Sequence, residues 1–159
     1  MKICCFFIAI FLVIQIAPVN AQNIEYDTVN KELNLRAFVN GAMVHHNLVN
    51  KKPEYPGGKT AWHNFLRSNI NIAVPFTNKA LPGRYEVLIR FIVGADGKVT
   101  SAGAKTNRGY GLEAEVIRCI NKSGTWSPAE TKDGQKVAVT LRTMVIFNVE
   151  RNNVTVSFP

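Results

Sequence analysis

Cysteine is scarce in this chain of 159 residues, and two of its three cysteines lie close to the N-terminus. Cys4 and Cys5 fall inside an apolar run, which leaves Cys119 alone in the rest of the chain. A single cysteine cannot form an intramolecular disulfide, and cysteine-rich zinc sites are excluded as well. We therefore expect a fold that is stabilised by its hydrophobic core.

Motifs for catalysis and for nucleotide binding are also absent. No serine lies in a Gly-x-Ser-x-Gly elbow, and the glycines of segment 108–111 lack the spacing of a phosphate-binding loop. Asp96 suits a tight turn, and Glu113 and Glu115 suit the first turn of a helix. We therefore predict that the protein is not an enzyme and that it takes no cofactor and no small-molecule substrate.

The three histidines are His45, His46 and His63. Adjacent residues of a helix or strand point in different directions, so His45 and His46 are poorly placed to share one metal ion. A three-histidine metal site is the alternative, but the spacing does not favour it. Cys119 could act as a nucleophile beside a distant histidine, but its place on an apolar helix stripe favours core packing. We predict no metal site and no catalytic residue.

Basic residues outnumber acidic ones by 19 to 11, which gives a formal net charge of +8. They are scattered along the chain, which indicates a solvated surface, although nucleic acid, anionic lipid and acidic proteins all favour basic surfaces. In the strand expected at 84–93, alternation places the arginines and the aromatic residues on opposite faces, so they cannot form one base-stacking platform. We predict that nucleic acid is not a partner.

The long apolar run of the chain covers residues 3–17 and follows Lys2. It is short for a membrane span, which needs about 20 residues. Val19 and Ala21 occupy the positions that a signal peptidase reads, so we predict a cleaved signal peptide at 1–21 and an exported protein. An uncleaved inner-membrane anchor is the alternative.

The remaining chain divides into an N-terminal extension at 22–52 and one domain at 53–159. The extension is polar, with weak helical periodicity over 29–44. Chain breakers at 53–58 open the domain. A first helix, capped by Thr60, is expected to bury a stripe of four apolar residues, Trp62, Phe65, Leu66 and Ile70. A second helix at 112–122 buries Leu112, Val116, Cys119 and Ile120.

Strand patterns surround the second helix. Residues 84–93 and 98–104 read as a hairpin around Asp96-Gly97, and residues 136–149 alternate over a long stretch. A short terminal strand is indicated at 154–158. These elements predict an α+β fold, a three-stranded antiparallel sheet with two helices packed on one face. A long strand that comes last leaves an open edge, and open edges take up extended segments of other proteins.

Four sequence blocks, in this order and spacing, resemble the TonB C-terminal domain family, especially its Bacteroidetes-type members. They are Pro53-Glu54-Tyr55-Pro56-Gly57-Gly58, Pro82-Gly83-Arg84-Tyr85 leading to Asp96-Gly97-Lys98-Val99, the second helix running into Trp126-Ser127-Pro128-Ala129, and the alternating strand 137–147. The resemblance implies a periplasmic domain of an energy transducer that binds outer-membrane receptors in transmembrane transport. The receptor segment would pair as an added strand with the last long strand.

Carried over by position, that binding edge consists of nine consecutive residues, Val139, Thr140, Leu141, Arg142, Thr143, Met144, Val145, Ile146 and Phe147. The predicted partner is a protein, an outer-membrane TonB-dependent receptor or another periplasmic protein. No proline occurs between 22 and 52, whereas full transducers of the family have a proline-rich spacer. The alternative is therefore an exported scaffolding module that self-associates, as a homodimer, without energy transduction.

Overall fold

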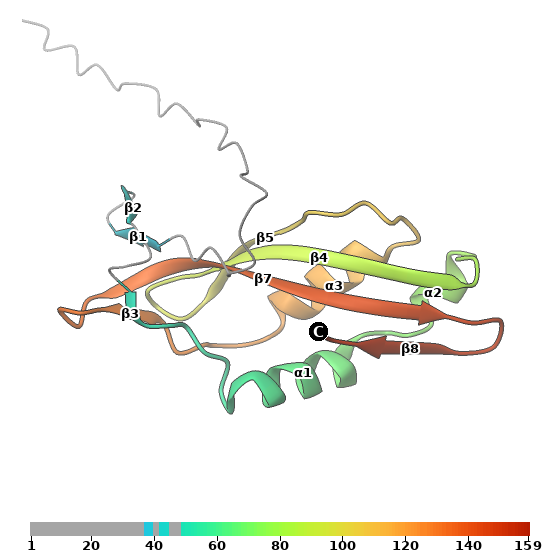
Figure 1. Ribbon diagram of the computed structural model, residues 1–159, viewed down its shortest axis with the longest axis horizontal. Helices are drawn as coiled ribbons and strands as arrows, with labels where there is room; N and C mark the ends of the chain where they lie inside the picture. The colour runs from blue at the N-terminus through green and yellow to red at the C-terminus, as the bar shows by residue number, and fades with distance from the viewer. Residues whose placement is uncertain (1–36, 40–41, 45–48) are drawn as a thin grey trace, which may run out of the picture.

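Two long strands, β4 (Gly83–Val93) and β7 (Lys136–Val149), form the centre of the fold (Figure 1). The computed structural model describes residues 37–39, 42–44 and 49–159. β4 and β7 pair antiparallel without interruption, from Gly83 opposite Val149 to Val93 opposite Val139. Long alternating patterns with many β-branched residues explain why these two segments form strands.

Shorter strands flank this pair on both sides. β5 (Val99–Ala104) pairs with the other edge of β4, through the hairpin predicted at Asp96-Gly97. Two strands pair with β7 on the side away from β4, namely β1 (Ala37–Val39) and β8 (Val154–Ser157). A third, β6 (Ala129–Thr131), pairs with Lys136 and Val137 at the start of β7, beyond the end of the β4 ladder. β2 (Ala42–Val44) pairs with β1, and β3 (Val49–Lys51) pairs with β6.

The structure confirms an α+β fold with an antiparallel sheet, but the predicted number of three strands is wrong. β7 is a central strand, because β8 follows it in the chain and returns along it. The helical periodicity at 29–44 is also misleading where the structure describes it, since 37–39 and 42–44 are strands.

Two helices, α1 (Gly58–Asn69) and α3 (Leu112–Asn121), pack on the same face of the sheet, and a short helix, α2 (Val74–Thr77), follows α1. α1 begins three residues earlier than a helix capped by Thr60 would. Its N-cap is Gly57, which has a φ of 84° that favours glycine. Among the described helices, none combines the length and the apolar character that a bilayer crossing requires. The predicted signal peptide, 1–21, lies outside the described residues.

The core lies between the helices and the odd-numbered side chains of β4 and β7. Val87, Ile89, Phe91 and Val93 are buried on this face, as the alternation predicts. α1 adds Trp62 and Leu66, and α3 adds four residues of its predicted buried stripe, Leu112, Val116, Cys119 and Ile120. Cys119 is thus a core residue, and burial raises the pKa of its thiol.

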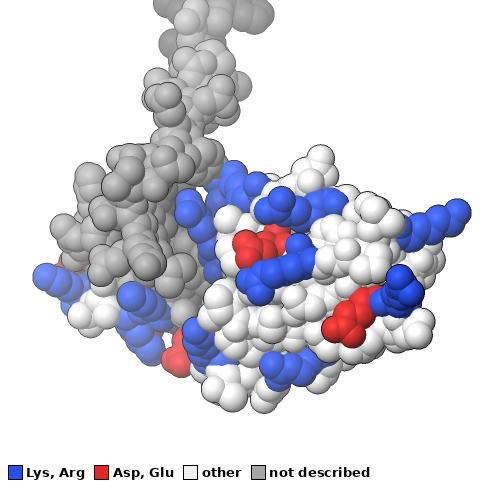
Figure 2. Space-filling view, turned by 45° about the vertical axis from the view of Figure 1, so that its right-hand side comes forward, with Lys and Arg blue, Asp and Glu red and all other residues white. Residues whose placement is uncertain are grey.

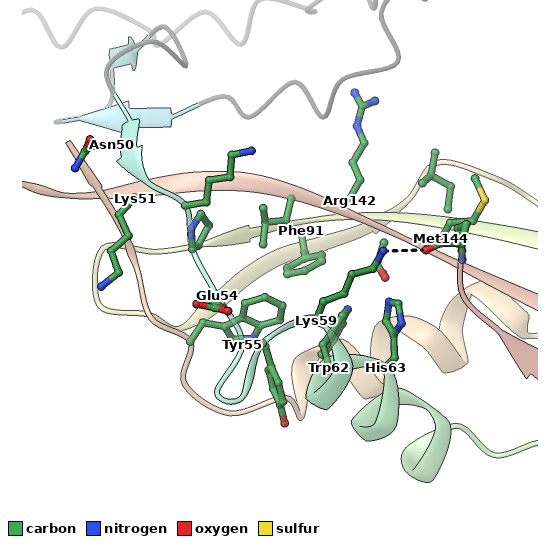
Figure 3. A pocket seen from close by; sticks show the side chains of 18 residues that line it. Asn50, Lys51, Glu54, Tyr55, Lys59, Trp62, His63, Phe91, Arg142 and Met144 are labelled. Atoms are coloured by element: carbon green, nitrogen blue, oxygen red, sulfur yellow. Dashed lines mark hydrogen bonds between the residues drawn. The ribbon is translucent and has the colours of Figure 1, made fainter. Parts of the chain in front are cut away.

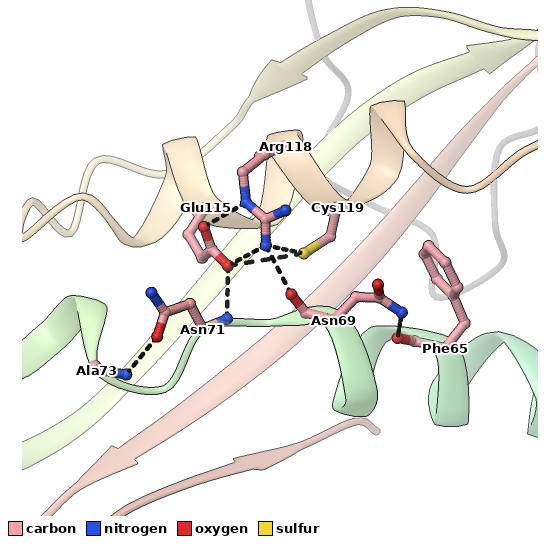
Figure 4. A network of polar contacts seen from close by, with 7 residues as sticks. All are labelled: Phe65, Asn69, Asn71, Ala73, Glu115, Arg118 and Cys119. Atoms are coloured by element: carbon pink, nitrogen blue, oxygen red, sulfur yellow. Dashed lines mark hydrogen bonds and ion pairs between the residues drawn. The ribbon is translucent and has the colours of Figure 1, made fainter.

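An ion pair between the buried Glu115 and the partly exposed Arg118 joins α3 to the end of α1 (Figure 4). Arg118 Nε and Nη2 donate to the two oxygens of Glu115 at 2.8 and 2.6 Å. Arg118 Nη2 also donates to the Asn69 carbonyl at 2.6 Å, and the Asn71 N–H donates to Glu115 at 2.6 Å. Burial raises the pKa of Glu115, but the bonds from Arg118 and Asn71 outweigh it, so the pKa is lowered overall.

Candidate functional site

The middle of β7 has an uncovered stretch on the side away from β4. β1 pairs with Ala138 and Val139, and β8 pairs with β7 from Ile146 onward. Between them lie residues 140–145, which have no strand partner on this side within the part of the chain that the structure describes. An interrupted sheet edge of this kind presents free backbone donors and acceptors.

The direction of the backbone groups follows from the neighbouring strand. The Leu88 N–H donates to Thr106 Oγ1 at 3.1 Å, and the Leu88 carbonyl accepts from the Lys105 N–H at 2.8 Å. Both partners lie on the β5 side of β4. Backbone groups alternate sides along an antiparallel strand, so even-numbered residues of β4 face β5 and odd-numbered ones face β7.

The same alternation applies to β7, because odd-numbered residues of β4 pair with odd-numbered residues of β7. Odd-numbered residues of β7 therefore bond to β4, and even-numbered ones face the other side. The N–H and C=O groups of Thr140, Arg142 and Met144 therefore point to the uncovered side. The β7–β8 turn is consistent with this direction, because the N–H of Glu150, an even-numbered residue, donates to the Asn153 carbonyl at 2.8 Å, on the side of β7 where β8 lies. The open edge thus offers three donors and three acceptors, spaced for one extended segment.

A groove of about 780 Å³ runs along this edge (Figure 3). One wall is β7 itself, where Leu141 and Thr143 have the side-chain positions that face the helices. Residues 50–55 form the wall at one end, and Pro159, beyond β8, lies at the other. The groove is therefore open along β7 and bounded at both ends.

Aromatic rings form the floor of the groove. Trp62 of α1 packs edge-on against Trp126, with ring centroids 4.9 Å apart. Phe91 of β4 lies 5.6 Å from Trp126 and 6.2 Å from Trp62, again between centroids. The Trp126 Nε1–H donates to Ser123 Oγ at 3.0 Å, so its polar group is satisfied inside the core. This floor is rigid and apolar, which suits the side chains of a docked strand.

Tyr55 connects the floor to the wall formed by residues 50–55. Its ring lies 5.3 Å from both Trp62 and Trp126, between centroids. The segment is held in place by two backbone hydrogen bonds, from the Glu54 N–H to the Ser127 carbonyl and from the Ser127 N–H to the Glu54 carbonyl, at 3.0 and 2.8 Å. The chain breakers at 53–58 thus build one end of the groove.

Basic side chains border the groove. Lys51, Lys52 and Lys59 line it, and Glu54 is the one carboxylate among the lining residues. Lys59 Nζ donates to the Pro159 carbonyl at 3.3 Å, across one end of the groove. Figure 3 shows Arg142 extending from β7 away from α1, toward the opposite face of the sheet. On the face shown in Figure 2, basic side chains outnumber acidic ones. A docked segment with acidic residues would be favoured.

The nine residues predicted for partner binding divide into two groups. Val139 already pairs with Ala37 of β1, and Ile146 and Phe147 pair with β8. These three have strand partners on both sides, which places them at the borders of the site. Within the part of the chain that the structure describes, the other six have no strand partner on the open side, namely Thr140, Leu141, Arg142, Thr143, Met144 and Val145. Thr143 is 8% exposed and Val145 is fully buried, because their side chains face the core.

Several groove residues carry no local signal in the sequence. Trp62 is expected in the buried stripe of the first helix; it and Trp126 are buried, but they also form the floor of the groove. Lys59 and Pro159 come together from positions 100 residues apart. Pairing of β8 with β7 could have been inferred from the short turn at 150–153, and it would have shortened the predicted edge.

His63 is the one histidine among the residues that line the groove. Among the described residues no group of three or more histidine, cysteine, aspartate and glutamate side chains could hold a metal ion. His63 stacks on Phe158 at 4.7 Å between centroids, and burial, with Lys59 and Arg67, lowers its pKa. His45 and His46 lie outside the described residues.

Comparison of the chain with protein-family models, with curated proteins and with solved structures finds no match. The geometry of the groove therefore carries the functional argument.

Proposed function

We propose that this protein is a binding domain that takes up an extended segment of another protein as an added strand along residues 140–145. One observation carries the proposal. The middle of β7 lacks a strand partner within the described chain, and a groove with an aromatic floor lies alongside it. Sheet edges with such pockets bind peptides by strand addition, in which the backbone provides affinity and side-chain pockets provide selectivity.

An added strand would use both parts of the site. Its backbone would bond to Thr140, Arg142 and Met144, whose groups point to the open side. Alternate side chains would enter the groove and contact Trp62 and Phe91. Its acidic residues would lie near the lysines of the border, so the expected ligand alternates apolar and polar positions and includes acidic residues.

The resemblance to the TonB C-terminal domain family supports a more specific version of this proposal. In it, the domain is periplasmic, and its partner is a segment of an outer-membrane receptor used in transmembrane transport. Two of the four resembling blocks fall at the proposed site, since residues of the block 53–58 line an end of the groove and residues 137–147 include the open edge.

Self-association is the second candidate, because the edge of one copy can pair with the same edge of another. Such isologous pairing needs the uncovered stretches to run antiparallel about a two-fold axis, which two β7 strands can satisfy. It would make the protein a scaffolding module without energy transduction. Sedimentation velocity separates the two, since self-association predicts a mass that rises with protein concentration.

Selection of random eight-residue peptides against the full chain tests the proposal. We expect the selected peptides to alternate apolar and polar residues, and to lose binding when alternate backbone N–H groups are methylated. Methylation of the other set of N–H groups, which would point to solvent, is the matched control. Equal effects of the two methylation patterns would argue against strand addition.

A further inference from the structure

Large apolar side chains are exposed at one end of the molecule. Among the described residues, Ile72, Phe76 and Leu81 are the large hydrophobic residues that stay exposed, at 49%, 41% and 66%. All three lie in segment 72–82, which contains α2 and the turn that leads into β4. We call this segment the apolar tip. Single exposed apolar residues are common, but a cluster of them marks an interaction surface.

The apolar tip is separate from the groove. α2 lies beside the start of β4, at the end of the sheet opposite the turn between β6 and β7 (Figure 1). None of the residues that line the groove belongs to segment 72–82. The tip is therefore a second surface, and a ligand bound there leaves the open edge of β7 free.

Hydrogen bonds hold the backbone of the tip in place. The Ala80 N–H donates to the Pro75 carbonyl at 2.8 Å, and the Tyr85 hydroxyl donates to the Leu81 carbonyl at 2.8 Å. Pro75 is buried, so it fixes α2 to the body of the domain, whereas Phe76 beside it is exposed. Backbone groups that are already paired can leave water at little cost. The tip thus presents apolar side chains on an ordered support that tolerates an apolar environment.

The charges of the tip favour an anionic surface. Lys79 lies between Phe76 and Leu81 in the sequence, and segment 72–82 contains no acidic residue. Arg84 follows the tip and forms an ion pair with Glu86 at 2.8 Å, which leaves Lys79 as the unbalanced charge of this stretch. The whole chain has a formal net charge of +8. Apolar side chains beside lysine, on a basic protein, suit a surface of anionic lipid headgroups.

We propose that the apolar tip docks on the surface of a bilayer that contains anionic phospholipids. Ile72, Phe76 and Leu81 would enter the boundary between headgroups and acyl chains, and the ammonium group of Lys79 would stay at the level of the lipid phosphates. A specific protein interface buries about 800 Å² on each partner. The tip instead offers three side chains on one short segment, which suits shallow insertion into lipid.

The proposed docking is weak and reversible, because one small apolar contact and a basic surface hold a protein to a membrane only in combination. It does not depend on strand addition at β7. Both sites can be occupied at once, so docking would hold the open edge near the membrane surface while a partner segment binds.

A fluorescent probe on the tip tests the docking. Residues 3–17 are apolar and can bind a bilayer by themselves, so the signal has to be local to the tip. Thr77→Cys, labelled with nitrobenzoxadiazole, places the probe on α2. The matched control is Gln135→Cys, an exposed and uncharged position in the turn between β6 and β7, at the opposite end of the sheet.

The full chain is used in both cases, with Cys4 and Cys5 replaced by serine. Cys119 is buried and stays unlabelled. With vesicles of phosphatidylglycerol and phosphatidylcholine in equal amounts, we expect the emission of the probe at residue 77 to rise at least about twofold, because the probe leaves water. The probe at residue 135 should not respond, and neither probe should respond to vesicles of phosphatidylcholine alone.

Substitutions in the labelled chain assign the response to the tip. Phe76→Ser/Leu81→Ser should abolish the rise, whereas Phe76→Leu/Leu81→Met keeps both side chains apolar and should retain it. Lys79→Gln leaves the apolar side chains intact, and we expect it to need about fivefold more lipid for the same response at low salt. Circular dichroism checks that each variant is folded.

Each outcome decides the inference. A rise at residue 77 alone, with anionic vesicles alone, that the serine variant loses, supports docking on anionic lipid. Equal responses of the two probes would indicate adsorption of the whole surface, and an equal response to phosphatidylcholine would remove the role of charge; both overturn the inference. So does the absence of any response to vesicles. A response without vesicles that grows with protein concentration would assign the tip to a second copy. Peptide binding at the groove is measured separately, so either proposal can fail while the other holds.

Discussion

Ser157, the last residue of β8, pairs with Ile146 of β7, which is the residue next to the uncovered stretch 140–145. The opposite border is set by Ala37 of β1, which pairs with Val139. The edge is thus a gap within a longer row of strands, and its length is fixed from both ends. A partner strand that fits it is limited to about six paired residues, unless β8 or β1 moves.

Proline substitutions should distinguish the two sides of β7. The Met144 N–H faces the open edge, whereas the Thr143 N–H faces β4 in the central ladder. Thr143→Pro removes a ladder hydrogen bond, so we expect it to lower the free energy of unfolding by at least about 2 kcal/mol more than Met144→Pro does. Urea unfolding of both variants measures the difference.

The same pair of variants bears on binding. Met144→Pro should keep the fold and weaken the selected peptide, because proline removes a donor of the open edge. Equal destabilisation by both prolines would contradict the assigned backbone directions. A folded Met144→Pro variant that binds the peptide with unchanged affinity would argue against strand addition at this edge.

The basic border should tune affinity for acidic segments. Lys59 lies at one end of the groove, where its Nζ donates to the Pro159 carbonyl. We expect Lys59→Glu to weaken an acidic selected peptide by about five- to tenfold at low salt, with a smaller effect at high salt, because screening reduces exposed charge interactions. Calorimetric titration at two salt concentrations measures it.

Arg151→Glu is the matched control for this charge reversal. Arg151 is exposed in the β7–β8 turn and does not line the groove. The Arg151→Glu substitution changes the net charge by the same amount as Lys59→Glu, but at a position outside the groove, so it should leave peptide affinity within about twofold. Similar weakening by both variants would mean that net charge, and not the border of the groove, governs binding.

The centre of the fold could be predicted from the sequence because its signals are local and strong. The alternation in β4 and β7 extends over many residues, and the Asp96-Gly97 turn joins β4 to β5 as expected. The three-residue strands β3 and β6 were not predicted. β3 and β6 have three residues each, which is too few for a period to emerge, and their pairing depends on contacts between distant segments.

Part of the proposed edge could be predicted from the sequence for the same reason. The open edge lies on a strand that the alternating pattern predicts, so residues 140–145 could be proposed from the sequence. The groove could not, because Lys59, Trp126 and Pro159 meet through tertiary packing that no local pattern encodes. The proposed edge is narrower than the predicted one, because β8 pairs with Ile146 and Phe147 and the sequence did not show what the terminal strand pairs with.

Gly97 has a packing role beyond its turn, and substitution by alanine should reveal it. Its φ is 79°, and an added Cβ would lie 2.2 Å from the Trp126 carbonyl oxygen, whose residue also donates its N–H to the Gly97 carbonyl. We expect Gly97→Ala to lower the free energy of unfolding by at least about 3 kcal/mol, from backbone strain and steric overlap together. Thermal or urea unfolding measures this loss.

Gly134 provides a control with the same backbone conformation. Its φ is 77°, but an added Cβ would meet nothing within 4 Å. Gly134→Ala should therefore cost about 1–2 kcal/mol, from backbone strain alone. A loss in Gly97→Ala no greater than that in Gly134→Ala would show that the contact with Trp126 is relieved by a small movement of the turn.

The ion pair between Glu115 and Arg118 should make stability depend on pH. The substitution Glu115→Gln removes the charge of the carboxylate, and we expect it to lower the free energy of unfolding by about 1–3 kcal/mol at pH 7. The pKa of Glu115 is lower in the folded protein than its ordinary value of 4.5. The folded state therefore binds fewer protons, so the contribution of the carboxylate is complete above that value and is lost as the pH falls through the lowered pKa.

The difference in stability between the unaltered protein and Glu115→Gln should accordingly shrink as the pH drops below about 4. Urea unfolding at several pH values between about 3 and 7, a range that spans the ordinary pKa of a glutamate side chain, measures this difference in stability. Glu150→Gln, in the exposed β7–β8 turn, is the control and should change stability little at any pH. A constant difference across this range would mean that Glu115 stabilises the junction of α1 and α3 through its shape and hydrogen bonds, with no net contribution from its charge.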